Sequence, residues 1–190
     1  MKSEEYFDTV CNKPGTWLFR ADQLLLAANV LHKKHEEAIA NYDENDQILD
    51  DDGWIVGDNS PCKKYFPISG TARMLVAFAL ECYIKATWLT QGHQLAANGN
   101  YEGMFKSEGH DLKKLYEKLG YAMSKQEISV LTRLSIISTG MGRYPVQKNH
   151  NKGSFPGQQK SESMRWSSPE DDEIVNDLID KLKKAIKVST

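Results

Sequence analysis

The sequence predicts an all-α protein: an up-and-down bundle of four to five helices in a single domain, residues 1–190, with two long polar insertions. Three observations favour this class. Apolar residues recur at three- and four-residue spacing in several segments, one segment is apolar almost all round, and helix-capping or helix-ending residues mark the boundaries. A chain of this length buries a sizeable core without disulfides or a metal ion.

The first predicted helix covers residues 16–41, with Thr16 as its N-cap after Pro14 and Gly15. Its apolar stripe consists of Trp17, Ala21, Leu24, Ala28, Leu31 and Ala38. The acidic insertion, residues 43–68, follows. It carries seven acids before its first base, Lys63, and we expect an exposed connection with a short hairpin through residues 47–56.

The second predicted helix covers residues 69–90 and is apolar almost all round, including the run from Met74 to Leu80. A helix without a polar face is covered on several sides, so we expect it at the centre of the bundle. Gly92 is the residue expected to end it.

Two shorter helices are predicted next, over residues 111–119 and 124–139. Gly120 is placed to end the first, and Ser124 with Glu127 forms a capping box for the second. The basic loop, residues 141–168, then has five bases and one acid. The final helix covers residues 169–188, with Pro169 at its first position, acids in its first turns and lysines in its last.

Composition excludes several classes. The formal charge of −2 gives no global basic excess, and the longest apolar run, seven residues, is too short to cross a membrane. The N-terminus lacks an apolar stretch, and three scattered cysteines indicate reduced thiols, so we expect a cytoplasmic protein. No metal-ligand spacing, glycine-rich phosphate loop or CxxC occurs, so we expect no metal and no cofactor.

The candidate ligand-binding residues begin with Glu81 and Lys85, four apart in the apolar second helix. The pair either holds that helix in register or projects into a pocket and polarises a ligand. His110 and Asp111 open the next helix. Asp111 suits a helix cap, whereas His110 either packs against the turn or transfers protons in a cleft.

Arg143 and His150 are candidate catalytic residues, separated by six positions in the basic loop. An arginine stabilises a phosphate in the transition state and a histidine moves the proton of a ribose hydroxyl, which metal-independent RNA cleavage requires. Tyr144, next to Arg143, is a further candidate for ligand binding, because basic segments with aromatic residues suit single-stranded RNA.

The chain resembles the HEPN domain of prokaryotes in three motifs. They are Leu80-Glu81-x-x-x-Lys85, Gly109-His110-Asp111-Leu112 and Gly142-Arg143-Tyr144-Pro145, and the similarity covers residues 17–145, with the final helix matching by arrangement. The resemblance implies an all-α bundle that commonly dimerises around a cleft. It also implies that Arg143 and His150 match the family's ribonuclease signature, an arginine followed after four to six residues by a histidine.

Three functions follow as alternatives. The first is a non-catalytic HEPN-like module that binds a nucleotide, an RNA or a protein partner, such as an antitoxin or a nucleotidyltransferase, through a shared polar cleft. Pro145 favours it, because proline disfavours a helix around Arg143. The second is a metal-independent ribonuclease, of the toxin or phage-defence type. The third is a structural bundle in which Glu81–Lys85 and Asp111–Arg143 are architectural ion pairs. Exposed apolar stripes on the first and last helices would suit a homodimer.

Overall fold

The computed structural model describes residues 2–40, 47–49, 55–58, 68–105, 110–138 and 169–188. These residues contain six helices: α1 (Ser3–Cys11), α2 (Pro14–Ala40), α3 (Ile68–Thr90), α4 (Leu112–Lys118), α5 (Lys125–Ile136) and α6 (Pro169–Val188). Two antiparallel strand pairs complete them: β1 (Gln47–Leu49) with β2 (Ile55–Asp58), and β3 (Ala96–Ala97) with β4 (Asn100–Tyr101). The prediction of a mostly helical protein is therefore confirmed.

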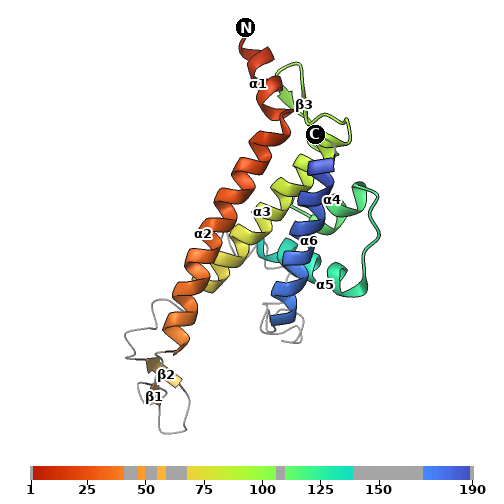
Figure 1. Ribbon diagram of the computed structural model, residues 1–190. Helices are drawn as coiled ribbons and strands as arrows, with labels where there is room; N and C mark the ends of the chain where they lie inside the picture. The colour runs from red at the N-terminus through yellow and green to blue at the C-terminus, as the bar shows by residue number, and fades with distance from the viewer. Residues whose placement is uncertain are drawn as a thin grey trace, which may run out of the picture.

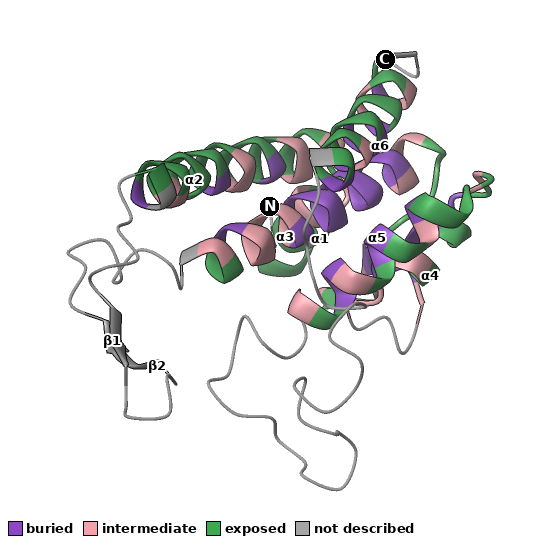
Figure 2. Ribbon diagram, turned by 90° about the horizontal axis from the view of Figure 1, so that it is seen from below, coloured by how far each residue is buried: buried purple, intermediate pink, exposed green. Residues whose placement is uncertain are grey.

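Helix α3 lies at the centre of the described structure. The long helix α2 runs antiparallel beside it, α6 packs on it as well, and the short helices α4 and α5 cover another side (Figure 1). Figure 2 shows buried residues concentrated where these helices face one another. Leu80, Tyr83 and Ile84 are all 0% exposed. The central position expected from the apolar sequence of this helix is confirmed.

Helix α2 begins at Pro14, two residues before the predicted start. The prediction of Thr16 as its N-cap is wrong, because Thr16 lies inside the first turn and its N–H donates to the carbonyl of Lys13 at 3.0 Å. A proline suits the first helical position, since its φ angle is already helical and no hydrogen bond is lost there.

Helix α1 and the β3–β4 pair were not expected. None of the residues of α1 is buried. Hydrogen bonds of the side chains of Asp8 and Asn12 hold this helix against the β3–β4 region. The Asn12 amide oxygen accepts from Leu95 N–H at 2.7 Å and Ala96 N–H at 3.1 Å, and its amide nitrogen donates to Ala96 O at 2.8 Å. Asp8 accepts from the N–H of Gly99 at 3.0 Å. These hydrogen bonds join segments more than 80 residues apart, so no local sequence pattern could predict them.

The predicted helix caps are largely confirmed. Asp111 caps α4 by accepting from the N–H of Lys114 at 3.1 Å. Ser124 and Glu127 form the capping box of α5, with bonds of 3.1 and 2.7 Å. Gly92 and Gly120 adopt positive φ angles of 88° and 80° beyond the ends of α3 and α4, where a side chain would strain the backbone.

The hairpin expected in the acidic insertion is present, because β1 and β2 pair with Gln47 opposite Asp58. The basic loop, residues 141–168, lies outside the described residues.

The apolar stripe of α6 is not exposed, contrary to expectation: Val175, Leu178, Leu182 and Ile186 are buried in the core. In the part of the chain that the structure describes, no helix combines the length and the hydrophobicity that crossing a membrane requires.

Candidate functional site

Three of the predicted ligand-binding residues meet in one cluster. The Nζ atom of Lys85 lies 2.7 Å from Glu81 Oε1, and Nδ1 of His110 lies 2.7 Å from Glu81 Oε2. Only 6% of the Lys85 side chain and 10% of the Glu81 side chain are exposed, whereas His110 exposes 28%. Glu81 is therefore a buried carboxylate that joins two basic groups, and His110 is the member of the cluster nearest to solvent.

Local structure explains how these side chains meet. Glu81 and Lys85 lie one turn apart on α3, so they share a face of the helix. His110 immediately precedes Asp111, the residue that caps α4, and the ring of His110 makes an edge-on contact with Phe78 at 5.6 Å between centroids. The start of α4 thus brings an imidazole against α3.

Lys85 is enclosed by aromatic rings. Its Nζ atom lies 5.0 Å from the ring centre of Trp17 and 5.3 Å from that of Tyr101, distances typical of cation–π contacts. The indole N–H of Trp17 donates to the carbonyl of Cys11 at 2.8 Å, which orients the ring. Between these rings, the ammonium donates a hydrogen bond to Glu81.

The hydrogen-bond pattern determines which nitrogen of His110 is free to react. An ionised carboxylate only accepts hydrogen bonds, so Nδ1 of His110 must donate to Glu81. In the neutral ring Nε2 then carries the lone pair, and in the protonated ring it becomes a second donor. The arrangement therefore offers Nε2 to a ligand either as a proton acceptor or as a positively charged donor.

A pocket of about 280 Å³ opens beside this cluster. Trp17, Arg20 and Leu24 of α2 form one wall, and the other is formed by Phe78, Glu81 and Cys82 of α3 with His110. Arg20 is exposed and makes no ion pair with any residue that the structure describes. Burial, with a smaller contribution from Glu81, raises the pKa of the Cys82 thiol to about 11, so this cysteine is protonated and is a poor nucleophile.

The other predicted site residues do not join the cluster. Asp111 caps α4, its carboxylate lies 3.2 Å from Lys114 Nζ, and it does not line the pocket. Arg143, Tyr144 and His150 lie outside the described residues, so the catalytic pair Arg143–His150 and the Asp111–Arg143 ion pair stay predictions. Among the described residues, no three histidine, cysteine or acidic side chains are grouped so that they could hold a metal ion.

Sequence reasoning missed Arg20, Cys82 and Tyr101. Arg20 had a usable signal, because it lies three residues after Trp17 and four before Leu24, at the edge of the predicted apolar stripe. Tyr101 had none, since its contact with Lys85 depends on how the β3–β4 pair lies against α1.

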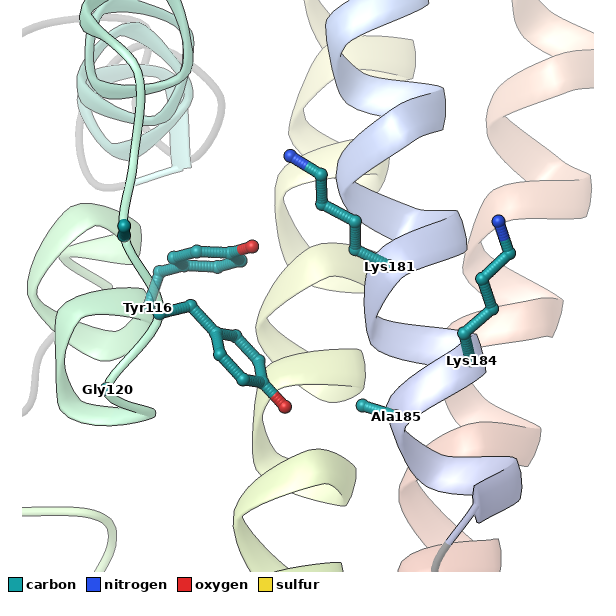
Figure 3. Close-up of a pocket in the computed structure, with 7 residues that line it drawn as sticks. Tyr116, Gly120, Lys181, Lys184 and Ala185 are labelled. Atoms are coloured by element: carbon teal, nitrogen blue, oxygen red, sulfur yellow. The ribbon is translucent and has the colours of Figure 1, made fainter.

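A second, larger cavity of about 510 Å³ lies between the end of α4 and α6 (Figure 3). None of its lining residues belongs to the first pocket.

Comparison of the chain with protein-family models, curated proteins and solved structures returned no significant match. The functional assignment therefore depends on the geometry of the chain itself.

Proposed function

We propose that the chain is a non-catalytic binding module, with an up-and-down, HEPN-like helical bundle, that holds the phosphate of a nucleotide in the pocket between α2 and α3. One observation carries the proposal: the buried Lys85–Glu81–His110 cluster presents an oriented imidazole to a pocket that Arg20 also lines. Buried charges are costly to desolvate, so an arrangement of this kind that opens to a pocket favours a ligand over packing alone.

The charges of the pocket favour an anion. Lys85 offsets the charge of Glu81, which leaves Arg20 as an unpaired positive group among the described residues. The planar guanidinium of arginine matches two phosphate oxygens, and a protonated His110 adds another donor at Nε2. A phosphate ester therefore satisfies the polar side of this pocket.

The size and the apolar wall favour a single nucleotide. The volume of about 280 Å³ lies just below the usual range for small-ligand sites, roughly 300–1,000 Å³. Trp17, Leu24 and Phe78 supply the apolar surface against which a base can pack. A dinucleotide cofactor would exceed this space.

The experiment is a calorimetric titration of the purified chain with a mononucleotide and with the matching nucleoside. We expect the nucleotide to bind at least about tenfold more tightly, because only it carries the charge that Arg20 recognises. Arg20→Ala should remove this preference, whereas Lys33→Ala, an exposed change on the same helix, should not. Equal binding of both ligands, or an unchanged preference in Arg20→Ala, would contradict the proposal.

A short single-stranded RNA extends the same experiment. If the RNA binds more tightly than the mononucleotide, the site accepts one nucleotide of a strand. If the RNA is cleaved, and cleavage stops in His150→Ala, the ribonuclease that the HEPN resemblance implies replaces the binding module.

We further propose that the chain forms a homodimer, because α2 exposes large apolar side chains: Phe19, Leu26 and Val30.

A further inference from the structure

The second cavity lies between the last turn of α4, the loop that follows it and α6. Its walls are formed by Tyr116 of α4, Tyr121 and Ala122 of the loop, and Lys181, Lys184 and Ala185 of α6. Figure 3 shows the side chain of Tyr116 directed from α4 towards α6. The volume of about 510 Å³ is within the range of small-molecule sites.

Tyr116 provides the main observation. The residue is 1% exposed, and its hydroxyl makes no hydrogen bond in the part of the chain that the structure describes. Burial, helped by Glu127 and Tyr121, raises the pKa of Tyr116 to about 12, so the hydroxyl keeps its proton. The hydroxyl is not one of the fully buried polar atoms that lack a partner among the described residues, so it reaches the cavity that it lines. A ligand in the cavity could accept its hydrogen bond in place of water.

The shape of the cavity favours a flat ligand. The rings of Tyr116 and Tyr121 meet edge to face, with centroids 5.8 Å apart and planes at 61°. Ala122 and Ala185 carry small side chains, so they leave space beside these rings. An aromatic ring placed there would pack against the tyrosines in the arrangements that aromatic side chains prefer.

The charges around the cavity favour an anion. Lys181 bonds to the carboxylate of Glu127, so these two charges offset each other. Lys184 is exposed and has no ion-pair partner among the described residues, which leaves a net positive charge at this wall. An acceptor that is also negatively charged would bond to Tyr116 and be attracted by Lys184.

We propose that this cavity binds a small aromatic carboxylate, with the carboxylate accepting a hydrogen bond from Tyr116 and the ring packed beside Tyr121 and Ala185. The proposal is independent of the nucleotide pocket, because the two cavities share no lining residue. Each can fail without the other.

Benzoate is the probe, and benzamide is its neutral counterpart of nearly the same shape. Ligand-observed NMR on the full chain should give a millimolar or lower dissociation constant for benzoate, and binding of benzamide about fivefold weaker or more. No binding of benzoate at millimolar concentration would overturn the proposal. Equal binding of benzamide would overturn the choice of an anion.

Two variants locate the site. Tyr116→Phe removes only the hydroxyl and should weaken benzoate about tenfold, because a hydrogen bond to a charged group is lost. Ala122→Trp, at an exposed position, should fill the cavity and abolish binding, whereas Ala27→Trp on the exposed side of α2 should not. Unchanged affinity in both Tyr116→Phe and Ala122→Trp would place benzoate elsewhere and overturn the proposal.

Discussion

Glu81 is the residue on which the first site depends. One of its oxygens accepts from Lys85 and the other from His110, so the loss of either partner would leave a buried carboxylate oxygen unpaired. Buried ion pairs add little net stability, because desolvation of both charges offsets their attraction. Removal of one partner is nevertheless strongly destabilising, because it leaves the other charge buried and unpaired. Comparing single and double variants in stability and in ligand affinity therefore distinguishes an architectural role of the pair from a ligand-binding role.

Lys85→Met should destabilise the chain by about 3 kcal/mol, because it leaves Glu81 buried beside a single partner. The apolar double variant Glu81→Leu/Lys85→Met should recover most of that loss, since no buried charge remains. Urea unfolding measures both changes. The double variant should also bind the mononucleotide more weakly, because His110 loses the group that orients it. Undiminished affinity in a stable double variant would show that the Glu81–Lys85 pair is architectural and does not contribute to nucleotide binding.

Part of this site could be predicted from the sequence, and for a physical reason. Glu81 and Lys85 are visible because their spacing and their apolar helix are local properties. His110 is visible through the capping residue that follows it. The contact of Lys85 with Tyr101 is not visible, since it depends on a strand pair that is held by Asn12 from the other end of the sequence.

At the scale of helices, one polar group ties three of them together. The hydroxyl of Tyr83 on α3 donates to Asp22 of α2 at 2.5 Å, and Lys183 of α6 lies 3.3 Å from the same carboxylate oxygen. The bond from Tyr83, together with Lys183, holds the pKa of Asp22 below its usual value against the opposing effect of burial. Asp22 therefore stabilises the packing of α2, α3 and α6 in its ionised form.

Tyr83→Phe should lower the free energy of unfolding by about 1–2 kcal/mol, because it removes a hydrogen bond to a charged group. Tyr116→Phe is the matched control. Both tyrosines are buried, but the hydroxyl of Tyr116 has no partner in the described part of the chain, so its removal should leave stability unchanged or higher. Equal losses in the two variants would show that the Tyr83–Asp22 bond is not the cause.

The same bond predicts a dependence on pH. A carboxylate whose pKa is lowered by folding stabilises the protein above its unfolded pKa, about 3.9 for aspartate, and loses that effect as pH falls through the lowered value. The difference in unfolding free energy between wild type and Asp22→Asn should therefore be largest near neutral pH and shrink in acid. Urea titrations across this range measure it.

At the scale of the whole molecule, local signals predicted most helices but not how the ends of the chain are held. Spacing and caps located α2 to α6 because these depend on residues within a few positions of each other. Helix α1 buries none of its residues, so it shows no strong apolar stripe. The sequence of α6 did predict an apolar stripe, but only packing could determine that the stripe faces the core.

Helix α2 leaves a second apolar face towards solvent. Phe19, Leu26 and Val30 are 66%, 67% and 56% exposed, and their spacing places them on one side of the helix. Sedimentation equilibrium should show a dimer in the wild type and a monomer in Leu26→Glu/Val30→Glu, because charges oppose burial of this face. Asn29→Asp, a charge change at an exposed position about 80° around α2 from this face, is the control. A monomeric wild type would contradict the homodimer.

The hydrogen bonds of Asn12 to Leu95 and Ala96 make the β3–β4 hairpin sensitive to deamidation of that one residue. Its amide donates to the carbonyl of Ala96 and thereby seats the hairpin that carries Tyr101 over Lys85. Deamidation to aspartate would replace that donor with a negatively charged oxygen facing a carbonyl, and the two would repel each other. Slow damage to one amide near the start of the polypeptide would thus loosen the aromatic cover of a buried ammonium on the central helix.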